Sequence, residues 1–230
     1  MKTLAVVQHT SAEYLGLLED HLEGRQIRFH YSRPFTAGGR LPGADALPDG
    51  LVLLGGGPWG SAGGRDLPTL QAEIELTRAA LDGGKPLLGV GLGAQILSIA
   101  AGGGSSAAPL QFRVSEARRI ETDALAGYLP ERFPLVTYGR DEPDLPASAR
   151  VLAVDEAGRP AVFQLGKRAL GFTGHPGIKA AIIEDLIMEF DESPEQPGPT
   201  LAQLRMTQRS IEDALVPTMT GLIKVLGLME

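Results

Sequence analysis

The sequence predicts an α/β protein with three layers and a mostly parallel central sheet. Apolar segments of strand length alternate with segments of helical periodicity in the first hundred residues, as in folds built from strand–helix–strand units. Several of the apolar segments end at glycine-rich turns, where a strand can reverse sharply into a helix. The 230 residues are enough to bury a substantial core.

The first half of the chain contains four short apolar segments that we expect to form parallel strands. They are residues 4–8, 27–31, 51–54 and 86–90. Helices are expected where apolar side chains recur every three or four residues, two of them ending at a glycine. These are residues 12–22, 70–81 and 95–101. Right-handed crossovers would place such helices on the faces of the sheet.

The pattern changes in the middle of the chain, where short strand-like segments are separated by Pro, Asp and Gly turns. They are residues 112–121, 133–138, 150–154 and 160–165. This arrangement predicts a mixed or antiparallel extension of the sheet. A further strand is expected at 170–173 and a helix at 180–190.

We divide the chain into a main domain, residues 1–190, and a C-terminal extension, residues 191–230. The extension opens with an acidic, proline-rich linker, DESPEQPGP, and continues as one or two helices broken near Pro217. The helices carry a partial apolar stripe, which consists of Leu201, Leu204, Ile211 and Leu215. This stripe must pack on the body or on another subunit, so self-association, for example as a dimer, is one expectation.

Composition excludes several classes of function. A formal net charge of −7 argues against a nucleic-acid or anionic-membrane partner. No apolar run reaches the ~18 residues of a membrane span, and the N-terminus lacks the features of a signal peptide, so a cytoplasmic location is expected. The chain contains no cysteine, which excludes disulfides, thiolate metal sites and a cysteine nucleophile. No metal-ligand spacing occurs, and we expect neither a metal nor a cofactor.

Three motifs, taken together and in order, carry a resemblance to a known family. They are GGGP (55–58), GKPLLGVGLGAQIL (84–97) and GFTGHPG (171–177). The chain resembles a class I glutamine amidotransferase domain, whose members carry a GGP loop, a G-x-C-x-G-x-Q elbow and an F-x-x-H-P-E segment. The resemblance covers about residues 1–190. It implies a flavodoxin-like fold and amide hydrolysis by a Cys-His-Glu triad.

The resemblance assigns positions to the triad, and two of its three members are missing. The nucleophile position is Gly91, the base is His175 and the position of the acid is Gly177. Glycine offers no nucleophile, and His175 lacks the carboxylate that would fix its tautomer. The elbow residue of such enzymes is strained and often has a positive φ, which glycine adopts freely.

The resemblance also implies a pocket beside the elbow. Backbone N–H groups at Gly56, Gly57 and Leu92 would form the oxyanion hole. Gln95 matches a family residue that lies beside the bound glutamine. These positions are present, so a pocket that still binds a ligand is expected.

The leading hypothesis is therefore a family member without glutamine hydrolysis, which binds a small molecule or acts as a regulatory subunit. Family members often serve synthases, so a synthase-type partner protein is one expectation. Two alternatives stay open. The pocket could support different enzyme chemistry through His175, or the turn at 89–94, which matches G-x-G-x-x-A, could bind a dinucleotide. Whether the chain is an enzyme is thus not decided by its sequence.

Overall fold

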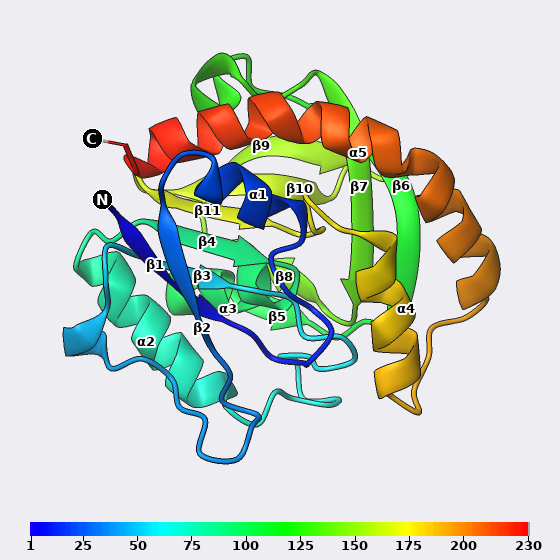
Figure 1. Ribbon diagram of the computed structural model, residues 1–230, viewed down its shortest axis with the longest axis horizontal. Coiled ribbons are helices and arrows are strands. Elements are labelled where there is room, and N and C mark those ends of the chain that lie inside the picture. The colour runs from blue at the N-terminus through cyan, green and yellow to red at the C-terminus, as the bar shows by residue number, and fades with distance from the viewer. Residues whose placement is uncertain (230) are drawn as a thin grey trace.

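Nine strands form one mixed sheet in the computed structural model, which describes residues 1–229 (Figure 1). The spatial order is β2-β1-β3-β4-β11-β10-β9-β6-β7. The first five strands in this order are parallel: β2 (Arg28–Ser32), β1 (Thr3–Val7), β3 (Gly50–Leu53), β4 (Leu87–Val90) and β11 (Ala169–Phe172). The other four pair antiparallel: β10 (Pro160–Leu165), β9 (Arg150–Asp155), β6 (Gln111–Arg119) and β7 (Arg132–Gly139). The predicted fold class, with its antiparallel extension, is confirmed.

A separate two-stranded sheet, β5 (Gly104–Ser106) with β8 (Glu142–Asp144), was not predicted from the sequence. Its residues are small or acidic and lie at or near the surface. They therefore lack the alternation of apolar and polar side chains from which strands are usually recognised.

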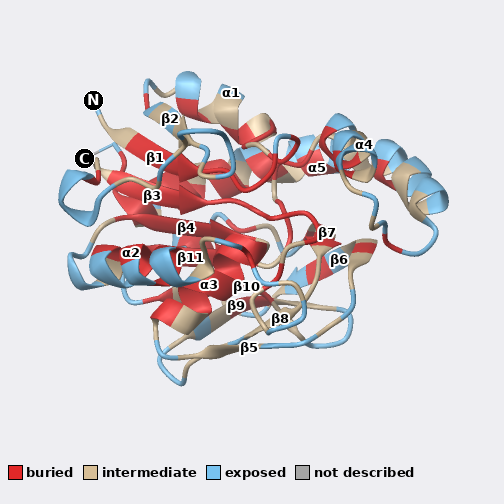
Figure 2. Cartoon of the chain, turned by 90° about the horizontal axis from the view of Figure 1, so that it is seen from below, coloured by how far each residue is buried: buried red, intermediate tan, exposed pale blue. Residues whose placement is uncertain are grey.

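Helices cover both faces of the large sheet and make the three layers. On one face lie α2 (Leu70–Asp82) and α3 (Leu92–Ala100); on the other lie α1 (Leu17–Glu23), α4 (Ala180–Glu189) and α5 (Pro197–Leu226). Alternate residues of β1 explain this division, since Leu4 and Val6 pack with α1 and α5, whereas Ala5 and Val7 pack with α2 and α3. The buried residues accordingly concentrate in the sheet and on the inner sides of the helices (Figure 2).

The first helix differs from the prediction, because it begins at Leu17 and not at residue 12. Gly16 precedes it with a φ of +62°, a conformation that interrupts a helix. Residues 8–16 instead form a loop at the carboxyl end of β1. This loop carries His9 and Glu13 into the interior of the protein, where both are almost fully buried.

The C-terminal extension also differs from the prediction, because α5 is one continuous helix that passes Pro217. A proline removes one helical hydrogen bond, but buried residues on both sides of it, Leu215 and Met219, fix the helix against the body. Three of the four residues of the apolar stripe are buried in the same way. Residue 230 lies outside the described residues. Within residues 1–229, no helix combines the length and the hydrophobicity required to cross a membrane.

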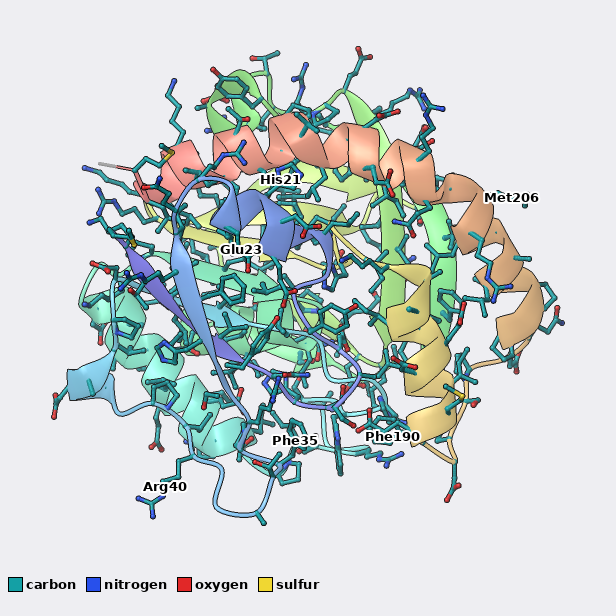
Figure 3. All side chains as sticks on the ribbon, viewed as in Figure 1. His21, Glu23, Phe35, Arg40, Phe190 and Met206 are labelled. Carbon is teal, nitrogen blue, oxygen red and sulfur yellow. The ribbon has the colours of Figure 1, made fainter. Side chains whose placement is uncertain are left out.

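Two methionines on α5 test whether this helix contributes to the core. Met219 is fully buried, whereas Met206 is 79% exposed and projects outward (Figure 3). We expect Met219→Ala to lower the free energy of unfolding by roughly 2–5 kcal/mol, because it leaves a cavity between α5 and the sheet. Met206→Ala should change it by less than about 0.5 kcal/mol. Urea denaturation of both variants measures the difference, and equal effects would contradict the described packing.

Candidate functional site

Gly91 forms a sharp turn between β4 and α3 at the carboxyl edge of the sheet. Its φ is +56° and its ψ is −116°, and its N–H donates to the carbonyl of Phe172 over 2.8 Å. A Cβ at this position would lie 3.3 Å from the Cα of Gly55. A side chain at residue 91 would therefore be both strained and tightly packed, and the turn offers no nucleophilic group.

A buried ion pair fixes the glycine loop that follows β3. His9 lies 3.0 Å through Nδ1 from the carbonyl oxygen of Gly55 and 2.8 Å through Nε2 from Oε2 of Glu73 on α2. The Gly55 carbonyl only accepts, so Nδ1 donates to it, and the hydrogen bond between Nε2 and Glu73 favours the positively charged imidazolium. Burial opposes this charge, but the Glu73 carboxylate holds the pKa of His9 above its usual value.

A second buried acid, Glu13, occupies one of the backbone donors expected to serve the site. The N–H of Gly57 donates to Oε2 of Glu13 over 3.1 Å. The carboxylate lies so close to Gly55 that a Cβ there would be 1.8 Å from Oε1. Burial raises the pKa of Glu13 to about 7. The N–H that the family resemblance assigns to an oxyanion thus already has an acceptor within the protein.

Glu13 was not identified from the sequence, because residues 12–22 were predicted to form a helix. The available signal was Gly16, whose position inside the predicted helix argues for a later start. A loop between β1 and that start lies at the carboxyl edge of the sheet, where α/β proteins place functional side chains.

His175 lies at the same edge of the sheet as Gly91, because β11 and β4 pair in parallel with Phe172 opposite Val90. Its Nε2 donates to the carbonyl of Tyr14 over 2.9 Å, and its Nδ1 accepts from the N–H of Gly177 over 3.2 Å. Burial lowers the pKa of His175 to about 4. The ring is therefore neutral, and both of its nitrogens have protein partners.

Gly177, the expected position of the triad acid, is packed against the start of α1. Its carbonyl accepts from the N–H of Leu17 over 2.8 Å. A Cβ at residue 177 would lie 2.3 Å from Cδ1 of Leu18, which is itself in the core. A glutamate at this position would have to displace that side chain.

A cavity of about 320 Å³ lies beside the elbow. Five of the seven predicted site residues line it: Gly56, Gly57, Gly91, Leu92 and Gln95. The other two, His175 and Gly177, are not among its lining residues. From the elbow the cavity extends to β6 and β7, which contribute Arg113 and Thr137.

Gln95 is held by the loops around the cavity. Its Nε2 donates to the carbonyls of Arg140 and Asp141 over 2.7 and 3.1 Å, and its Oε1 accepts from the hydroxyl of Ser61 over 2.6 Å. The side chain thereby joins the loop after β3 to the loop after β7 and fixes the shape of the cavity wall.

The linker after α4 returns to the rim of this cavity. Glu192 accepts from Arg65 over 2.6 Å and also pairs with Arg140. The guanidinium of Arg65 stacks on the ring of Trp59 at 4.7 Å. The linker is thus attached to the rim.

No group of three or more His, Asp or Glu side chains within residues 1–229 is arranged to hold a metal ion.

Comparisons with known proteins relate the chain to enzymes that act on glutamine. A family model described as "Glutamine amidotransferase class-I" matches residues 32–180. The GMP synthase [glutamine-hydrolyzing] of Aeropyrum pernix is 31% identical over 169 residues, which make up 69% of this chain and 31% of that protein. The chain thus spans about a third of the length of this curated relative.

Solved structures share the fold over nearly the whole chain. A glutamine amidotransferase from Thermotoga maritima superposes with a TM-score of 0.80 at 21% identity and covers 98% of both chains. A glutamine amidotransferase from Methylobacillus flagellatus has the same TM-score at 20% identity and covers 98% of this chain and 95% of its own. The C-terminal helix is therefore part of the shared fold.

The buried carboxyl of Glu13 makes stability depend on pH. Its pKa rises from an ordinary 4.5 to about 7 on folding, so the folded state holds the proton more tightly. The contribution of Glu13 to the free energy of unfolding is then most favourable below pH 4.5. It falls by about 3 kcal/mol in all as the pH rises to about 7. We expect Glu13→Gln to lack this loss.

Chemical denaturation at several pH values tests the expectation. The stability of Glu13→Gln relative to the unaltered protein should rise by about 3 kcal/mol between pH 4.5 and 7. Glu23→Gln, which changes an exposed glutamate on α1, should keep a constant difference. A constant difference for Glu13→Gln as well would show that Glu13 titrates as an exposed acid.

Proposed function

Because the chain belongs to the class I glutamine amidotransferase family, we propose that it is a member that does not hydrolyse glutamine and acts as a small-molecule-binding or regulatory subunit. The observation that carries the proposal is the elbow. Gly91 occupies it in a chain without cysteine, and the neighbouring Gly57 N–H is bonded to Glu13. A cavity of about 320 Å³ nevertheless lies beside the elbow.

The magnitudes support a loss of hydrolysis. Removal of the nucleophile of a triad costs about a millionfold in rate. Loss of one oxyanion donor lowers the rate of such an enzyme by about a further hundred- to thousandfold. The neutral His175, with both nitrogens engaged, supplies no base toward the cavity. Binding, by contrast, requires none of these groups.

A synthase-type partner is part of the proposal. The Aeropyrum relative is named as a GMP synthase that hydrolyses glutamine, and the match covers only about a third of it. A partner of that kind would carry the synthetic step. Self-association through the apolar stripe has less support, since Leu204, Ile211 and Leu215 are buried against the same chain.

The two alternative functions also have less support. At the 89–94 turn, the N–H groups of Gly91, Gly93 and Ala94 already bond to backbone carbonyls, whereas a dinucleotide site needs such donors for the pyrophosphate. Chemistry based on His175 would require its ring to leave the Tyr14 carbonyl and turn into the cavity.

Ammonia release from glutamine by the purified chain tests the proposal directly, with an active amidotransferase as the positive control. We expect no release above the uncatalysed rate. Turnover that survives repeated purification and scales with the concentration of the chain would refute the proposal.

Restoring a thiol at the elbow should not restore activity. We expect Gly91→Cys to hydrolyse no glutamine, because the new side chain meets Gly55, Glu13 still holds the Gly57 N–H, and His175 remains engaged. The strained backbone should also lower stability by roughly 1–3 kcal/mol. Gly91→Ser is the matched control for the strain. Glutamine-dependent ammonia release by Gly91→Cys alone would show that the rest of the site is intact.

A further inference from the structure

The loop between α4 and α5 is attached to the rest of the protein by very few contacts. We call its residues 191–195 the strap (Figure 1). Within residues 1–229, no backbone–backbone hydrogen bond joins the strap to the body. Its side-chain hydrogen bonds to the described residues are all made by Glu192, and the ring of Pro194 is buried. Glu192 is therefore the polar attachment of the strap, and Pro194 is its apolar one.

Glu192 joins two arginines that come from different loops. One of its carboxylate oxygens accepts from Nη1 of Arg65 over 2.6 Å, and the other pairs with Arg140. Arg65 belongs to the loop after β3, and Arg140 belongs to the loop after β7. The two cations repel each other, and the shared carboxylate offsets this repulsion.

The same two arginines support part of the cavity wall. The guanidinium of Arg65 lies 4.7 Å from the centre of the Trp59 ring and 5.8 Å from the centre of the Phe190 ring. Nε of Arg140 donates to the carbonyl of Pro58 over 2.6 Å. Because Trp59 and Arg140 both line the cavity, a movement of the strap would be transmitted to the wall.

The ion pairs of the strap can break at little cost. The side chains of Glu192 and Arg65 are 40% and 33% exposed, and ion pairs in contact with water contribute little and are screened by salt. The backbone changes direction at both ends of the strap. Phe190 leaves α4 in an extended conformation, and Gln196 has a φ of +48°, which is uncommon for a residue with a side chain.

Deeper contacts confine any opening to the rim. The Asp141 carboxylate accepts from the N–H groups of Ser61 and Ala62 over 2.9 and 3.1 Å. These bonds join the loop after β3 to the loop after β7 independently of the strap. Release of Glu192 would therefore free the strap and uncover Trp59 without separating the two loops.

We propose that the strap is a gate for the cavity, which the ion pairs of Glu192 with Arg65 and Arg140 keep closed and which opens when these pairs break. This inference rests on the proposed function, because it assigns a regulated entrance to the proposed ligand pocket. In the open state the Arg65 guanidinium no longer covers the Trp59 ring, and small molecules enter the cavity from the side of the strap. Rising ionic strength shifts the gate toward this state.

The fluorescence of Trp59, the only tryptophan of the chain, measures the opening. The neutral quencher acrylamide is titrated into the full chain at low salt and at about 1 M NaCl, where the Debye length is about 3 Å. We expect Glu192→Gln to raise the quenching constant about two- to fivefold at low salt, the shift in an equilibrium that loss of such ion pairs gives. The unaltered protein should approach the same value at high salt.

Two further variants and a second measurement make the result specific. Glu195→Gln is the matched control, since it neutralises an exposed glutamate of the same strap that forms no ion pair within residues 1–229, and it should leave quenching unchanged. Glu192→Asp keeps the charge on a shorter side chain and should give an intermediate quenching constant. Hydrogen exchange of residues 58–65 and 191–195 should be faster in Glu192→Gln, which tests the gate without relying on fluorescence.

The inference is overturned if Glu192→Gln matches the unaltered protein in quenching and exchange, if Glu195→Gln changes them equally, or if salt leaves the quenching of the unaltered protein constant. Ammonia release from glutamine is measured on the same samples. Hydrolysis by the unaltered chain would refute the proposed function and leave the gate standing. Unchanged quenching and exchange in Glu192→Gln, without hydrolysis, would refute only the gate.

Discussion

The close approach of two glycine backbones is the constraint on which the rest of the site depends. Gly55 and Gly91 meet at the carboxyl edge of the sheet, and a Cβ on either would contact a neighbour at 3.3 Å or less. Because Gly55 has no side chain, the Glu13 carboxylate can lie against it and reach the Gly57 N–H. A cavity thus lies beside Gly91, while residue 91 itself carries no functional group.

This arrangement places several ionisable groups in a dry interior. His9 and Glu73 offset each other's charge as a hydrogen-bonded pair, but Glu13 has a weaker set of partners and a pKa near neutrality. Burial of a carboxylate is unfavourable unless donors compensate for the lost water. The buried ionisable groups around the elbow thus lower the stability of the fold, which is more typical of a functional site than of a purely structural region.

The sequence predicted the large sheet and most helices, because apolar periodicity and glycine-rich turns report directly on strands and their junctions. Five of the seven site residues predicted from the sequence line one cavity, because the motif spacing places their loops at one edge of the sheet. The sequence could not predict the direction of the His175 ring or the burial of Glu13. Both depend on contacts with the loop at residues 8–16. The second half of this loop was predicted to be helical, but tertiary packing sets its conformation.

The packing of Gly177 against Leu18 has an evolutionary consequence. A return to hydrolysis would need a thiol at residue 91, a vacated donor at Gly57 and a carboxylate at residue 177, where the first helix now closes the space. Each of these three positions is already taken up by a neighbour: the Gly55 backbone at residue 91, the Glu13 carboxyl at the Gly57 N–H and the Leu18 side chain at residue 177. Under the proposed function, core packing would therefore oppose a gain of hydrolysis in addition to the missing thiol.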